Sequence, residues 1–192
     1  MHEKFQGLLL QSTPYLNGAK ILKVFSAENG LTSLIAKSVE KKGWSSLTTP
    51  FCIAEWVIKK GRSDLHTLQD AHLLDPLSIL KQDFTLLSTA GEIAQELIRS
   101  QLPSKRGGEL YPLTLAYLKK LPLSPATLLA SFRLKLLLWE GLLSPSEPTL
   151  QTDESLFQTL AFAKTFGEMT QLSVPESLHT KIKKLLEERL KE

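Results

Sequence analysis

The hydrophobic pattern of the chain changes at Asp75-Pro76, and this change divides the sequence into two parts. Before it, apolar and mixed runs are short and alternate with turn-forming residues, which is typical of β-strands. These runs are Phe5–Ser12, Ala19–Ser26, Leu31–Ser38, Thr48–Lys60 and Leu65–Leu74. After it, apolar residues recur with the period of helices. The sequence therefore predicts an α+β protein with a β-domain over 1–75 and an all-α helical domain over 76–192.

The β-rich part has the pattern of a small closed barrel. Asn29-Gly30 predicts a tight hairpin between the second and third runs, because both residues accept positive φ. The segment from Phe51 to Ile58 is apolar at nearly every position, as expected when a strand lines a barrel and its other face is partly covered. Five such strands predict an oligonucleotide-binding (OB) fold, the commonest barrel of this size.

Periodicity and capping residues predict the helices of the second part. Asp83 is expected to cap the first helix, and Ser124-Pro125 to begin the third. The third helix is apolar almost all round, so we expect it at the centre of a bundle. The last helix is expected to open with a capping box. The expected helices are 84–101, 110–120, 126–143, 153–169 and a final one from Ser173.

Composition narrows the function classes. The net charge is only +3, so any surface for a polyanion must come from local clustering of cations. Cys52 is the single cysteine, which excludes an internal disulfide and a zinc site of several thiolates, and no cofactor or metal is expected. Apolar runs stay well short of the ~20 residues that cross a bilayer, which predicts a cytoplasmic protein without a membrane partner. The common catalytic motifs are absent, so an enzyme is not expected.

Cations gather at the ends of the predicted strands. If the ends of the third and fourth strands meet at one rim of the barrel, these cations would capture phosphates without sequence preference. Charge alone leaves open the alternative that they only keep loops soluble. Trp44 is a candidate for stacking on bases, whereas Trp56 lies in an apolar strand and is expected in the core. The candidate DNA-binding residues are Lys20, Lys23, Lys37, Lys41, Lys42, Trp44, Lys59, Lys60 and Arg62.

Two cations interrupt the apolar helix predicted over 126–143. Arg133 and Lys135 follow Phe132, and burying an unpaired cation is costly. Either their charged ends reach the surface, or they border a groove that receives an acidic partner peptide. A salt bridge to Glu140 or to another helix is a further explanation that the pattern leaves open.

The order and spacing of several segments resemble the RecO family of recombination mediators, over about residues 5–143. The matching segments are Glu28-Asn29-Gly30-Leu31, Ala36-Lys37 with Lys42, Thr49-Pro50-Phe51, Asp64 to Ala71, Leu73 to Leu77, and Phe132 to Leu138. The resemblance implies an OB barrel that binds single- and double-stranded DNA and promotes annealing. It also implies work with RecR in loading RecA, and a helical region that contacts the C-terminal tail of single-stranded-DNA-binding protein.

By the same resemblance, Lys37, Lys41 and Lys42 match the family's basic loop, and Arg133 matches an arginine that would meet the tail. Ser38 and Glu40 depart from the family's glycine and arginine. Many members carry a four-cysteine zinc module after the central helix, which is lacking here, so a shortened form without metal is expected. The expected role is RecF-pathway repair at the nucleoid. A protein-interaction adaptor with little DNA binding is the alternative.

Overall fold

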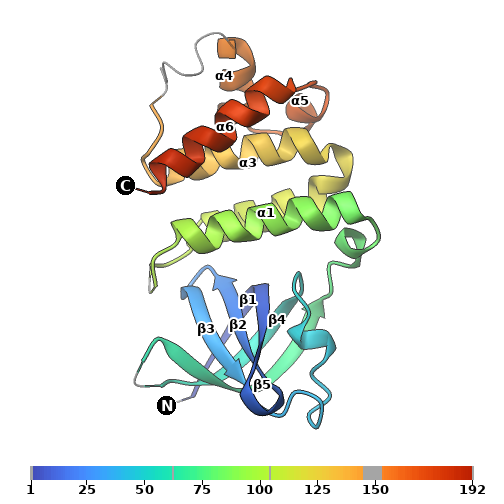
Figure 1. The fold of residues 1–192 in the computed structure, drawn as a ribbon, viewed down its shortest axis with the longest axis vertical. Coiled ribbons are helices and arrows are strands. Elements are labelled where there is room, and N and C mark those ends of the chain that lie inside the picture. The colour runs from blue at the N-terminus through green and yellow to red at the C-terminus, as the bar shows by residue number, and fades with distance from the viewer. Residues whose placement is uncertain (1, 62, 104, 145–152, 192) are drawn as a thin grey trace.

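The computed structural model describes residues 2–61, 63–103, 105–144 and 153–191. Figure 1 shows a barrel of strands below a stack of helices. The strands are β1 (His2–Tyr15), β2 (Ala19–Ser26), β3 (Gly30–Ala36), β4 (Ile53–Lys59) and β5 (Leu65–Asp75). The α-helices are α1 (Phe84–Ser100), α2 (Leu110–Lys120), α3 (Pro125–Trp139), α4 (Glu154–Phe162), α5 (Phe166–Thr170) and α6 (Glu176–Arg189). The predicted α+β class is confirmed.

The five strands close into a barrel in the order β1-β2-β3-β5-β4. Neighbouring strands pair antiparallel except β3 and β5, which run parallel with Ser33 opposite Leu65. The antiparallel pairing of β1 with β4 closes the barrel, with His2 opposite Lys59. Closure removes the free sheet edges, and this five-stranded arrangement confirms the predicted OB fold.

Two apolar cores explain why β4 is hydrophobic on both faces. Trp56 and Ile58 point into the barrel, where the indole Nε1 of Trp56 donates to the carbonyl of Gly7 at 3.0 Å. Phe51 and Ile53 belong instead to the core that the barrel shares with the helices. In Figure 1, helix α1 lies across the end of the barrel next to the helices, where Phe51 and Ile53 are buried. The helices thus cover part of the second face of this segment, as expected from the sequence.

The central position predicted for the third helix is confirmed. Among the described elements, α3 packs against all five other α-helices, which buries nearly its whole circumference. Asp83 caps α1 as predicted, because its side chain accepts a hydrogen bond from the backbone N–H of Leu86 at 3.0 Å. No helix within the described ranges is long and apolar enough to cross a membrane.

Several predicted boundaries are wrong. The helix expected over 153–169 is two helices, because Ala163 leaves the helical conformation after α4. Helix α6 begins after Pro175 without a side-chain cap, so the expected capping box does not form. The fourth strand starts at Ile53, after a short 3-10 helix. At the hairpin only Gly30 has positive φ, at +60°.

Candidate nucleic-acid interface

Two rows of partly exposed side chains cross the outside of the barrel. Cross-strand pairing places Gln11, Lys23, Ser33 and Leu65 in one row and Thr13, Ile21, Ile35, Thr67 and Lys59 in the other. Residues next to them in sequence, such as Leu22, Leu34 and Leu68, are buried inside the barrel. Since strand side chains alternate between faces, the two rows lie on the outside of the barrel, and the surface they form, the outer sheet face, curves around the closed barrel.

The outer sheet face combines an apolar centre with cations. Ile21 and Ile35 lie side by side on β2 and β3. Lys23 donates from its Nζ to the Ser33 hydroxyl at 2.9 Å, and exposed Lys59 lies beside Thr67, two strands from Ile35. Strands in a sheet lie about 4.8 Å apart, so the longer row follows the curved outside of the barrel for ~19 Å. This surface can contact bases or sugars at its centre and phosphates at its margins.

The lysine loop after β3 is a compact turn. Backbone N–H groups of Lys42, Gly43 and Trp44 donate to carbonyls of Ser38, Glu40 and Val39 at 3.0–3.1 Å. Lys37, Lys41 and Lys42 are all exposed on this turn. Lys37 lies two residues beyond Ile35 and therefore extends the charge of the outer sheet face along β3.

Trp44 does not offer a face to bases. Only 6% of Trp44 is exposed, and its ring belongs to the barrel core with Val39. The ammonium of Lys42 lies 4.2 Å from the centroid of the ring, where it makes a cation–π contact. The prediction of base stacking by Trp44 is therefore wrong for this conformation. The turn folds back over the end of the barrel, which buries the indole.

The remaining predicted DNA-binding cations make contacts at separate places on the barrel. Lys20 donates to the Thr48 hydroxyl at 3.1 Å, and Lys60 pairs with Glu3 at 2.6 Å. The turn between β4 and β5 projects on the left of the barrel in Figure 1, whereas the segment after β3 follows its lower right. The cations therefore do not form the single rim expected from the sequence, although Lys23 and Lys59 lie on the outer sheet face and Lys37 lies just past the end of β3. Arg62 lies outside the described residues.

The helical candidates are structural residues. Phe132 is fully buried, with its ring edge-to-face against Tyr117. Arg133 is 3% exposed and donates from Nε to Glu96 at 2.7 Å and from Nη2 to Glu92 at 2.6 Å. The open question about Arg133 is thus settled in favour of a salt bridge to another helix.

The side chain of Lys135 binds the C-terminal end of α4, so it is not available to a ligand. Its Nζ donates to the carbonyls of Ala161 and Ala163 at 3.1 and 3.0 Å. Burial lowers the pKa of the Lys135 ammonium. Carbonyls at a helix C-terminus lack intrahelical partners, so a cation there stabilises the helix end. The partner-tail site predicted at these three side chains is therefore not an exposed surface.

A groove runs between α1 and α6, with α3 as its floor, and apart from Arg133 none of its lining residues was a predicted site residue. Two clefts of about 680 and 320 Å³ form it and share Glu92, Arg133 and Lys183. Leu186 and Leu190 line the larger cleft, and cations at its margin are Arg99, Lys183 and Lys191. The signal in the sequence was weak, because these residues look like the solvated face of two ordinary helices.

Glu96 lies at the wall of the larger cleft and is almost fully buried. Its Oε1 accepts from Arg133, whereas its Oε2 has no hydrogen-bond partner among the described residues. Burial raises the pKa of Glu96 to about 7, although the neighbouring Arg133 acts in the opposite direction. Glu96 therefore changes its protonation state near neutral pH.

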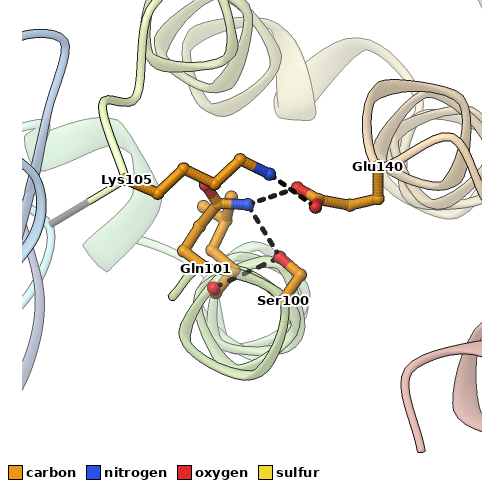
Figure 2. Close-up of polar contacts among 5 residues, drawn as sticks. Ser100, Gln101, Lys105 and Glu140 are labelled. Carbon is orange, nitrogen blue, oxygen red and sulfur yellow. Dashed lines mark hydrogen bonds and ion pairs between the residues drawn. The ribbon is translucent and has the colours of Figure 1, made fainter. Parts of the chain in front are cut away.

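The loop between α1 and α2 joins the helices to the barrel. The backbone N–H of Gly108 donates to the carbonyl of Ala27 in the β2–β3 hairpin at 3.0 Å. At the other side of this loop, Lys105 and Gln101 donate to the carboxylate of Glu140 at 2.7 and 2.6 Å (Figure 2). The α1–α2 loop thus links the hairpin to the ends of α1 and α3.

Within the described ranges, side chains suited to metal binding do not cluster, and the single cysteine is buried. No group of three or more His, Cys, Asp or Glu side chains that could hold a metal occurs in the described part of the chain. Burial raises the pKa of the Cys52 thiol to about 11, and its Sγ donates to the carbonyl of Leu47. A thiol held neutral in this way is a poor nucleophile.

The barrel, its strand order and the exposed cations define an OB-fold module joined to a helical bundle. Residues 1–77 match the sequence model of the family described as "Recombination protein O N terminal". The barrel therefore matches the N-terminal domain of the RecO family, and the resemblance to this family is confirmed.

Relatives named "DNA repair protein RecO" match beyond the barrel. The protein of Chlamydia pneumoniae is 29% identical over 141 residues, which is 71% of this chain and 56% of the relative. The protein of Heliobacterium modesticaldum is 32% identical over 136 residues, or 69% of this chain and 49% of the relative. The protein of Acetivibrio thermocellus is 22% identical over 165 residues, or 83% and 65%. The chain spans about half the length of the first two relatives.

Proposed function

We propose that the chain is a DNA-binding recombination mediator that acts in repair without catalysis. Its barrel binds single- and double-stranded DNA and promotes annealing. With RecR it assists the loading of RecA onto DNA covered by single-stranded-DNA-binding protein, in the cytoplasm at the nucleoid. The named relatives support the repair role, and the OB barrel supports nucleic-acid binding.

The outer sheet face is the observation that supports DNA binding most strongly. It includes the outward side chains of β2 and β3, the strands with which OB folds bind oligonucleotides. Lys23 and Lys59 lie on the outer sheet face itself, and Lys37 lies just past the end of β3. Lysines that contact phosphates release counterions, so binding through these side chains is independent of sequence and sensitive to salt.

The test is fluorescence anisotropy of a labelled oligonucleotide of deoxythymidine across a salt series. Each lost phosphate contact flattens the slope of log K against log salt by about 0.7 for single strands. Replacing Lys23, Lys37 and Lys59 by alanine should therefore reduce the slope by about 2. The matched control removes three exposed lysines of the helical region, Lys120, Lys164 and Lys184. Equal slopes for parent and barrel variant would remove the outer sheet face from the proposal.

A protein-interaction adaptor is the second candidate, and the groove between α1 and α6 favours it. Apolar Leu186 and Leu190 line the larger cleft together with four cations, Arg99, Arg133, Lys183 and Lys191, and three carboxylates, Glu92, Glu96 and Glu187. Arg133 is paired with Glu92 and Glu96, so the exposed cations Arg99, Lys183 and Lys191 outnumber the remaining carboxylate. This lining suits a peptide that combines acidic residues with a large apolar side chain. The tail of single-stranded-DNA-binding protein is the partner that we propose for this groove. Arg133 is unsuitable for testing it, because its removal would disturb the core.

The peptide test uses Arg99→Ala with Lys191→Ala, two changes at exposed positions. A labelled peptide of acidic residues ending in phenylalanine should bind the parent and lose affinity on this double change. Lys120→Ala with Lys184→Ala removes the same charge elsewhere and should leave peptide affinity unchanged. Equal affinity for the groove variant and the parent would exclude the groove as the peptide site.

A further inference from the structure

A polar pocket of about 300 Å³ lies at the mouth of the barrel. Its walls come from the start of β1, the β2–β3 hairpin and the turn between β4 and β5, and the α1–α2 loop adds Arg106. None of the residues used for the outer sheet face lines it. Barrel mouths are frequent ligand sites, and this volume is at the lower end for small-molecule pockets.

The charges around the pocket disfavour a phosphate. Three carboxylates, Glu3, Glu28 and Asp64, stand against two permanent cations, Lys60 and Arg106. Lys60 is already paired with Glu3, whose other oxygen accepts from the side-chain amide of Asn29 at 2.8 Å. The hydrogen bond from Lys60 lowers the pKa of Glu3 despite partial burial, so this carboxylate stays charged. A neutral polar group fits this surrounding better than an anion.

The hydrogen-bonding groups match such a neutral ligand. His66 accepts from the backbone N–H of Gly61 at its Nδ1, so neutral His66 carries its proton on Nε2 and is a donor there. The Asn29 amide nitrogen is used by Glu3, which leaves the amide oxygen as an acceptor. Arg106 adds a planar set of donors and Ile58 an apolar wall. The pocket thus offers donors, acceptors and apolar contact together.

Strand alternation places the pocket next to the outer sheet face. Thr32 precedes Ser33 on β3, Lys60 follows Lys59, and His66 follows Leu65. Thr32, Lys60 and His66 line the pocket, whereas Ser33, Lys59 and Leu65 belong to the outer sheet face. The pocket lining and the outer sheet face therefore meet at adjacent residues on β3, at the end of β4 and at the start of β5.

We propose that the pocket receives one nucleobase of a single strand whose backbone lies on the outer sheet face. This inference rests on the proposed DNA binding. The pocket volume equals that of about ten water molecules, at roughly 30 Å³ each, which is enough for a single base and too little for several. The base edge meets His66 and Asn29, and the guanidinium of Arg106 can stack on its ring, as arginine does on unstacked bases.

The experiment compares two probes at one salt concentration: ten deoxythymidines, and the same length of backbone with abasic residues throughout. Base contacts in single-strand binders each contribute severalfold to more than a hundredfold, so the parent should prefer the intact probe by roughly 10-fold or more. His66→Ala with Arg106→Ala should lose most of this preference. The control variant, His72→Ala with Lys120→Ala, also removes one histidine and one permanent cation, at exposed positions away from the pocket. It should keep the preference for the intact probe.

The ratio of the two affinities separates the pocket from general charge, because both probes carry the same backbone phosphates. An unchanged ratio in the His66→Ala, Arg106→Ala protein would overturn the proposal that the pocket receives a base. Equal salt-sensitive binding of both probes by the parent would overturn it as well. Either result leaves the proposed DNA binding intact. Binding of neither probe at low salt would overturn the proposed function and the pocket together.

Discussion

Arg133→Met tests the buried ion pair that joins α3 to α1. The substitution keeps an unbranched side chain but removes the guanidinium that donates to Glu92 and Glu96. The Glu92 side chain is 39% exposed and can be solvated, whereas that of Glu96 is only 9% exposed. The cost of the change therefore falls mainly on Glu96, which is left as a buried carboxyl without its cation.

The size of this cost depends on pH. Removing one partner of a buried ion pair destabilises a protein by about 3–5 kcal/mol while the remaining group is charged. Burial raises the pKa of Glu96 in the folded parent from 4.5 to about 7, so near pH 5 the folded state already holds it as the neutral acid. A raised pKa means that stability falls as pH rises from about 4.5 to 7. Loss of Arg133 raises this pKa further and extends the fall to higher pH.

We therefore expect Arg133→Met to lower the free energy of unfolding by about 3–4 kcal/mol at pH 8 and by ~1 kcal/mol at pH 5. Urea denaturation followed by circular dichroism at both pH values measures the difference. Adding Glu96→Gln should recover most of the loss at pH 8, because the unpaired charge is gone. A loss that is equal at the two pH values, or below ~1 kcal/mol at pH 8, would refute this explanation.

Three further substitutions test other contacts by thermal or urea denaturation. Gly30→Ala places a Cβ in overlap with the carbonyl oxygen of Lys105, at a φ of +60° that disfavours alanine. The change should therefore destabilise the protein by several kcal/mol or detach the α1–α2 loop, and near-parental stability would contradict that contact. Asp83→Ala removes the N-cap of α1 and should cost ~1 kcal/mol, whereas Asp83→Asn should cost much less. Lys135→Met leaves the end of α4 without its donor and should cost about 1–2 kcal/mol; an unchanged midpoint would show that the bonds contribute little.

The periodicity of the apolar residues and the positions of the turn-forming residues were enough to predict the architecture. The change at Asp75-Pro76 separates the barrel from the helices, and β5 ends at Asp75. The apolar character of Phe51 to Ile58 predicted a strand covered on both faces, because burial on each side leaves a direct mark on residue type. The helix boundary near residue 163 was missed, because the apolar pattern continues through Phe162 and Phe166. The contact that stabilises the boundary comes from Lys135 of α3, which donates to the carbonyls at the end of α4.

The candidate sites depended on contacts that local sequence does not encode. Trp44 stands beside lysines in sequence, but the turn over the barrel end buries it. Arg133 was correctly considered for a salt bridge to another helix, yet its partners lie about forty residues away on α1. Glu96 resembles any acidic residue of an amphipathic helix until α3 packs against it. Pairing across the barrel was likewise needed to see that Lys23 and Lys59 both lie on its outward-facing rows.

Lysine footprinting by acetylation and mass spectrometry, with and without an oligonucleotide of deoxythymidine, tests the central claim most directly. We expect bound DNA to protect Lys23, Lys37 and Lys59, while Lys120 and Lys184 react equally in both samples. Protection confined to the helical region, with the barrel lysines as reactive as in the free protein, would contradict the assignment of DNA binding to the outer sheet face.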